Sequence, residues 1–118
     1  MWSLEETPLQ AQIYDALYHL GATANYVGFY YTARAVWLCA QEPDRLMLVT
    51  KWLYPEVAQS FQTTWKAVER SIRTVISVAW STNPEALEEM AGHKLEKKPR
   101  PAQFLAIMSK HLFPARVS

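Results

Sequence analysis

The chain has 118 residues, enough for one domain, whereas two domains sharing that length would each be short of core. Half of the residues are hydrophobic and 13% are aromatic, which predicts a packed interior and argues against global disorder. The net charge of +1 does not suggest a strong nucleic-acid binder. The charge is unevenly distributed, however: residues 1–50 carry −3 (two basic, five acidic) and residues 51–118 carry +4 (ten basic, six acidic). This distribution allows a basic face on the second half of the chain.

Glycine and proline divide the first half of the chain into three expected helices. The first covers about residues 8–20, where apolar residues recur at helical spacing, and Gly21 stands where a C-terminal cap belongs. The second covers about residues 26–40; its aromatic opening could also start a strand, but no partner strand follows. Asp44 is placed to cap a third helix that continues to about Leu53.

Three closely spaced elements follow in the middle of the chain. Pro55 suits the first turn of a short helix over about residues 55–61. Residues 62–64 form a tight turn, and either threonine in it can cap the next helix. That next helix, over about residues 65–80, is the clearest in the sequence.

The remaining chain predicts two more helices separated by a basic loop. A short helix is expected over about residues 84–91, where Gly92 terminates it. A proline-containing basic loop follows over residues 93–101, and a last helix covers about residues 102–112. No segment shows the sustained alternation of a strand, so the expected fold class is all-α.

The long helix has two chemically different faces. At about 100° per residue, one side gathers the apolar residues Trp65, Val68, Ile72, Val75, Ile76 and Ala79. The other side carries a near-vertical row formed by Lys66, Arg70, Arg73 and Ser77. The ordinary interpretation is an amphipathic surface helix with a Glu69–Arg73 pair one turn apart.

The short helix and turn before it favour a functional interpretation. Such a helix, a tight turn and a longer helix with basic residues in its first two turns form a helix-turn-helix, here over about residues 55–80. An arginine can donate two hydrogen bonds to guanine, and a carboxylate can accept one from cytosine. Glu69, Arg70 and Arg73 are therefore predicted to contact bases in the major groove of DNA.

Phosphate contacts are predicted on both sides of those base contacts. Hydroxyls and free N–H groups at the start of the long helix can hold phosphates, and a basic loop beside DNA gains from counterion release. The residues predicted to contact phosphates are Thr63, Thr64, Lys66, Lys94, Lys97 and Lys98. For the loop lysines, a solvated loop without DNA contact is an equally good interpretation.

No residue pattern indicates catalysis, a metal site or a cofactor. The three histidines lack the spacing of metal ligands, and Glu88 and Glu89 point about 100° apart on a helix, a poor arrangement for acid–base chemistry. Cys39 lacks an intrachain disulfide partner and fits a small core residue in a reducing compartment. Without a leader or an apolar run approaching about 18 residues, we expect a soluble, cytoplasmic protein with no membrane contact.

Several segments resemble, in order and spacing, one family of transcription regulators. They are Leu53-Tyr54-Pro55-Glu56-Val57-Ala58, Phe61 with Thr63-Thr64, Val68-Glu69-Arg70 with Ile72-Arg73, Val78-Ala79-Trp80-Ser81, Lys98-Pro99 and Phe104-Leu105-Ala106-Ile107-Met108, together with the Gly21…Gly28-Phe29-Tyr30 region upstream. The family is the C-terminal DNA-binding effector domain of the master response regulator of sporulation in spore-forming bacteria. The resemblance extends from about Ala11 to Leu112.

The resemblance implies a six-helix fold with a helix-turn-helix and binding to double-stranded DNA at boxes with a TGTCGA-like core. The boxes often occur in tandem, which implies a homodimer on DNA. Glu69, Arg70 and Arg73 match the base-reading positions of the family. Residues 81–95 match the segment that takes part in contacting the sigma factor of RNA polymerase.

The sequence departs from the family in two respects. Ala67 stands where the family has a further arginine in its recognition helix, which bears on the box sequence and affinity. The chain also has no room for the receiver domain, so residues 1–118 are interpreted as a single helix-turn-helix effector domain, either stand-alone or part of a longer protein. A helical protein-interaction module that has lost DNA binding is the alternative interpretation.

Overall fold

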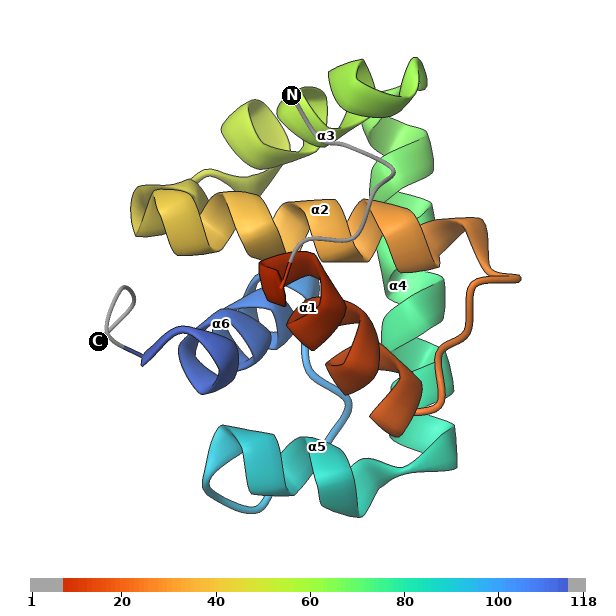
Figure 1. The fold of residues 1–118 in the computed structure, drawn as a ribbon, viewed down its shortest axis with the longest axis vertical. Helices are drawn as coiled ribbons and strands as arrows, with labels where there is room; N and C mark the ends of the chain where they lie inside the picture. Colours follow the sequence, from red (N-terminus) through yellow and green to blue (C-terminus); the bar gives the residue numbers. More distant parts are fainter. Residues whose placement is uncertain (1–7, 115–118) are drawn as a thin grey trace.

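Six segments form α-helices in the computed structural model, which describes residues 8–114 (Figure 1). In chain order they are α1 (Pro8–His19), α2 (Val27–Gln41), α3 (Tyr54–Phe61), α4 (Trp65–Thr82), α5 (Pro84–Ala91) and α6 (Pro101–Leu112). No strand occurs within this described range, so the all-α class and the six-helix fold implied by the resemblance are confirmed, with one helix fewer than the residue pattern predicted. None of these helices is long and apolar enough to cross a membrane.

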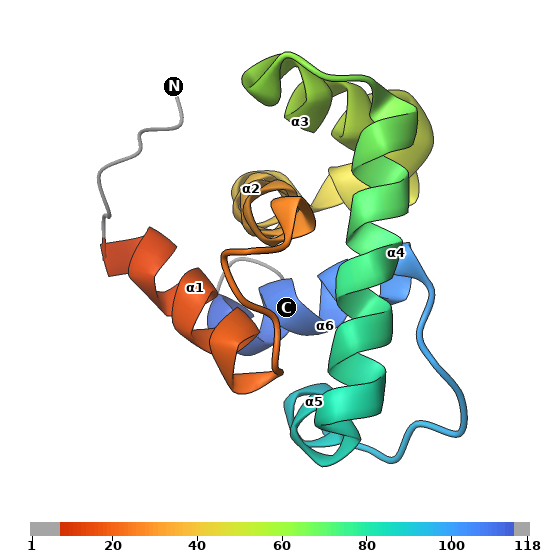
Figure 2. The same ribbon diagram turned by 90° about the vertical axis from the view of Figure 1, so that its right-hand side faces the viewer.

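The apolar helix α2 lies in the middle of the fold. Figure 2 looks along it and shows α1, α4 and α6 around it, and α2 contacts all three. Its buried residues include small ones that let neighbouring helices approach closely: Gly28, Ala33, Ala35, Cys39 and Ala40. A Cβ atom at Gly28 would collide with the carbonyl oxygen of Ser71 on α4. Glycine at this position therefore allows α4 to pack directly on α2.

The expected α-helix over residues 44–53 is wrong. A 3₁₀ turn, Pro43–Met47, and a wide π turn, Val49–Leu53, take its place. Asp44 lies inside the 3₁₀ turn, which has no side-chain cap, so its predicted capping role is also wrong.

The backbone at Leu48 explains the break. Its φ of −138° and ψ of 51° lie outside the helical region and separate the two turns. Leu48 is 50% exposed and Met47 is 82% exposed, so these apolar residues mark no buried face. Pro55 has no N–H to donate to a carbonyl in the preceding turn, so a regular ladder of hydrogen bonds cannot run from the π turn into α3.

The caps predicted for α1 and α5 are both present. Gly21 and Gly92 have positive φ values of 101° and 81°, which glycine adopts without strain. A side chain at Gly21 would collide with Thr82, and the Asn83 amide donates a hydrogen bond of 3.0 Å to the carbonyl of His19. These contacts attach the end of α1 to the corner between α4 and α5.

Candidate nucleic-acid interface

The turn between α3 and α4 is stabilised by its own backbone and by one threonine. Gln62 ends α3 in a left-handed conformation (φ 54°, ψ 48°), and its N–H donates to carbonyls in the last turn of α3. The Thr64 hydroxyl accepts a hydrogen bond of 3.2 Å from the N–H of Ala67. This N-cap confirms the prediction that a threonine begins the long helix. The helices are joined by residues 62–64, as a helix-turn-helix requires.

Helix α4 buries one face and exposes the other. Its buried residues are Val68, Ile72, Val75, Ile76 and Ala79, all predicted for the apolar side. Trp65, expected on the same side, is 37% exposed at the start of the helix. Lys66, Arg70 and Arg73, here called the basic row, are exposed, and Ser77 is half-buried. Helix α4 lies along one side of the molecule (Figure 2), and the side chains of the basic row are exposed there.

Glu69 and Arg73 form the ion pair expected from their spacing. The distance from Arg73 Nη2 to Glu69 Oε2 is 3.8 Å, and the side chains are 60% and 33% exposed, respectively. Exposed pairs of this kind contribute about 0–1 kcal/mol, so another partner can replace either residue at little cost. Arg70 forms no ion pair with any residue that the structure describes.

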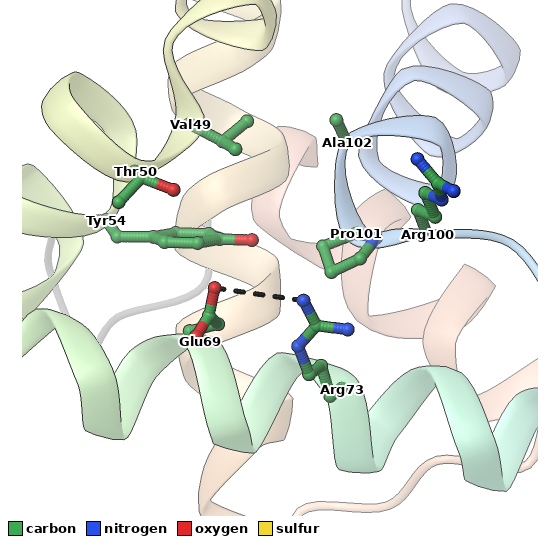
Figure 3. A pocket seen from close by; sticks show the side chains of 8 residues that line it. All are labelled: Val49, Thr50, Tyr54, Glu69, Arg73, Arg100, Pro101 and Ala102. Atoms are coloured by element: carbon green, nitrogen blue, oxygen red, sulfur yellow. Dashed lines mark ion pairs between the residues drawn. The ribbon is translucent and has the colours of Figure 1, made fainter.

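A cleft of about 370 Å³ opens beside this ion pair (Figure 3). Its lining comes from the π turn, the starts of α3 and α6, and the middle of α4: Val49, Thr50, Tyr54, Arg100, Pro101, Ala102, Glu69 and Arg73. Two of the predicted base-contacting residues therefore lie beside the N-terminus of α6, some 30 residues further along the chain. The sequence did not predict this cleft.

Tyr54 is a buried residue whose hydroxyl faces the cleft. The residue is only 1% exposed, and its hydroxyl points into the open space between α4 and the start of α6 (Figure 3). Burial, with a smaller effect from the nearby Glu69 charge, raises the pKa of Tyr54 to about 12. The phenol therefore stays protonated at neutral pH and can donate a hydrogen bond. It makes no hydrogen bond to any other residue in the range 8–114.

The basic loop between α5 and α6 lies against α4. The N–H of Leu95 donates to the Glu88 carboxylate at 2.7 Å, and the Lys98 ammonium donates to the Ser77 hydroxyl at 3.0 Å. Leu95 and Pro99 are buried, which fixes the loop at two further points. Figure 2 shows the loop running beside α4. The loop is thus held beside the basic row.

The other residues predicted to contact phosphates lie at two separate places. Thr63, Thr64 and Lys66 are grouped at the start of α4, where Thr64 already serves as the cap. Lys94 and Lys97 are exposed on the basic loop. Among the loop lysines within the described residues, only Lys98 has a hydrogen bond to α4.

Arg45, which was not predicted to have a role, braces α3. Its Nε and Nη2 atoms contact both carboxylate oxygens of Glu56 at 3.0 and 3.3 Å, and Nη1 donates to the carbonyl of Leu38 at 2.9 Å. Its guanidinium carbon lies 5.0 Å from the centroid of the Trp52 ring. The only signal in the sequence was an arginine within a leucine-rich segment. This brace joins α3 to the end of α2.

Tyr54 was also missed as a site residue, because its position before Pro55 indicated only the start of a short helix. Nothing in local spacing places it opposite Glu69 and Arg73. That juxtaposition arises from the packing of α3 on α4.

The family model described as "Sporulation initiation factor Spo0A C terminal" matches residues 13–112. The matched range includes the helix-turn-helix, the cleft and the basic loop.

Proposed function

Because the chain belongs to the sporulation initiation factor Spo0A C-terminal family, a family of DNA-binding regulatory domains rather than enzymes, we propose that α4 enters the major groove and reads its base pairs. The observation that carries this proposal is the basic row, which is exposed on a helix whose opposite face is core. The major groove of B-DNA is wide enough for one α-helix. A helix anchored along its inner face can present the outer face as a rigid unit.

The base contacts follow from the chemistry of three side chains. Arg70 and Arg73 donate to O6 and N7 of guanines, and Glu69 accepts from N4 of a cytosine. The weak Glu69–Arg73 pair opens so that both groups turn to bases, which their exposure permits. A G·C-containing box such as the TGTCGA-like core suits these three residues.

The phosphate contacts flank the groove. Thr63, Thr64 and Lys66 contact the strand beside the start of α4, where free N–H groups also point outward. Lys94, Lys97 and Lys98 contact the backbone from the basic loop. The Lys98–Ser77 hydrogen bond supports this role because it holds the loop at the edge of α4 before DNA binds.

The wider proposal concerns partners and location. Two copies bind tandem boxes as a homodimer, and residues 81–95, which include α5, contact the sigma factor of RNA polymerase. Glu85 and Glu89 are exposed there and offer an acidic surface, whereas Glu88 bonds to Leu95. A protein with this role acts on bacterial DNA in the cytoplasm.

A fluorescence-anisotropy titration tests the proposal with a TGTCGA-containing duplex and a scrambled duplex of the same composition. We expect about 10³-fold tighter binding to the box duplex at physiological salt. Replacing Arg70 with alanine should remove most of this preference. The matched control is Lys110→Ala, which removes an exposed cation from the last turn of α6. Equal, weak binding to both duplexes would favour a protein-interaction module instead.

A further inference from the structure

The cleft beside α4 contains a hydrogen-bond donor that the proposed base contacts do not use. Tyr54 is almost fully buried, yet its hydroxyl points into the cleft and has no partner among residues 8–114. The ring of Tyr54 is fixed by burial while its hydroxyl faces the cleft, so the hydroxyl is held in place to donate to a ligand there. The hydroxyl is protonated at neutral pH, so it favours a ligand that accepts hydrogen bonds.

The start of α6 forms another wall of the same cleft. Arg100 is the N-cap residue and gives no side-chain cap, and Pro101 occupies the first turn. The N–H groups of Ala102 and Gln103 therefore have no intrahelical acceptor and no capping side chain. A helix N-terminus in this state carries a partial positive charge that favours anions.

The formal charges around the cleft have a positive balance. Arg73 and Arg100 line it together with a single carboxylate, Glu69, which is already paired with Arg73. Arg73 also lines a smaller hollow of about 70 Å³ with Lys98 and Pro101, which places a third cation next to the start of α6. An anion in the cleft would thus face two types of donor and an excess of cations.

We propose that this cleft binds one phosphate group, held by the Tyr54 hydroxyl and the N-terminus of α6 and attracted by the positive charges of Arg73 and Arg100. The inference rests on the proposed function only in that the cleft opens beside the helix assigned to the groove. The phosphate group has two sources: a phosphodiester of the DNA backbone, or a small phosphorylated molecule that competes with DNA for Arg73. The cleft volume of about 370 Å³ accommodates either.

The first experiment measures what both sources share. Inorganic phosphate is titrated into the ¹⁵N-labelled protein at constant ionic strength, and amide chemical shifts are followed. We expect saturable shifts at Ala102 and Gln103, and about tenfold weaker binding for Tyr54→Phe, which loses one donor to a charged group but keeps the buried ring. Tyr18→Phe, a change at a half-exposed tyrosine on α1, should bind phosphate like the wild type.

Several results of this titration would overturn the proposal. Chemical shifts that do not saturate would show that the cleft has no phosphate site. Equal phosphate affinity of Tyr54→Phe and the wild type would show that the Tyr54 hydroxyl does not bind the phosphate. Arg100→Gln gives a second variant that is safe for folding because the side chain is exposed. It should also weaken phosphate binding, and unchanged affinity in both variants would contradict the site.

The second experiment separates the two sources. Single phosphates of the box duplex are replaced in turn by uncharged methylphosphonates. If the ligand is DNA, one replacement should weaken wild-type binding about tenfold and Tyr54→Phe binding much less, because the two changes remove the same contact. If the ligand is a small molecule, no replacement should show this coupling, and phosphate should weaken duplex binding more than chloride of equal ionic strength.

These measurements also separate the inference from the proposed function. The inference fails if no methylphosphonate replacement is coupled to Tyr54→Phe and phosphate does not compete with the duplex. The phosphate bound in the NMR titration is then an adventitious ion only. The wild-type preference for the box duplex is recorded in the same titrations. That preference can survive failure of the cleft site, and phosphate binding in the cleft can survive loss of the preference.

Discussion

Two arginine–glutamate pairs in this molecule have opposite characters. Arg45 contacts both carboxylate oxygens of Glu56, a backbone carbonyl and the Trp52 ring, and its side chain is only 12% exposed. Arg73 approaches Glu69 at a single distance of 3.8 Å and is 60% exposed. The first pair holds the fold together, whereas the second leaves both groups able to change partners.

The difference shows that charge composition alone says little about DNA binding. Arg34 and Arg45 are the two basic residues of the first half of the chain, and the structure uses both internally, Arg34 next to Ser60 and Trp37. The arginines of α4 instead form an exposed row on a helix whose opposite face is core. The packing around an arginine therefore decides whether its guanidinium is available to bind DNA.

The largest expected effect comes from breaking the Arg45 brace. Arg45→Met should lower the free energy of unfolding by about 3 kcal/mol, because Glu56 loses a bidentate partner in a partly buried place. Urea denaturation followed by tryptophan fluorescence measures this change. Arg73→Met is the matched control and should lose less than about 1 kcal/mol. Equal losses would show that the two pairs do not differ as described.

The next effect concerns DNA rather than stability. Arg73→Ala should weaken binding to the box duplex by about 1–3 kcal/mol and relax the choice of base at one position. Binding to a random duplex should change much less, and the free energy of unfolding should stay within about 1 kcal/mol of the wild type. A uniform loss on both duplexes would make Arg73 a phosphate contact instead of a base contact.

A smaller and non-specific effect is expected at the basic loop. Lys98→Ala should weaken all duplexes to a similar degree, because a phosphate contact carries no sequence information. The slope of log affinity against log salt should fall by about one. Affinities measured across a salt series test this, with Lys110→Ala as the control. A loss confined to the box duplex would contradict the assignment.

The smallest expected effect is on the Glu69–Arg73 pair itself. Glu69→Gln should change the free energy of unfolding by no more than about 0.5 kcal/mol, because the pair is exposed and long. The same variant should lose discrimination at a single C·G pair of the box. A large loss of stability would mean that Glu69 is a structural residue like Glu56.

Helical periodicity was enough to predict α4, its buried face and its threonine cap, because these depend on residues close in sequence. The same reasoning failed over residues 44–53, where an apolar pattern belongs to two irregular turns with exposed side chains. The irregular path is fixed by the Leu48 backbone and by the Arg45 contacts with distant groups.

The candidate site shows the same limit. The basic row follows from spacing along one helix, but the cleft joins residues from four segments that only the packing brings together. Tyr54 illustrates this, since an aromatic residue at a helix start gives no sign that its hydroxyl lies in the same cleft as an arginine of another helix. Sequence patterns can therefore identify a helix for recognition, but not the groups beside it.

The most direct test of the central claim places 7-deazaguanine at each guanine of the box, which removes one major-groove acceptor and leaves base pairing intact. If Arg73 reads a guanine, one substitution should weaken wild-type binding about tenfold and leave Arg73→Ala binding nearly unchanged. If every substitution affects both proteins equally, or neither, α4 does not read that groove through Arg73.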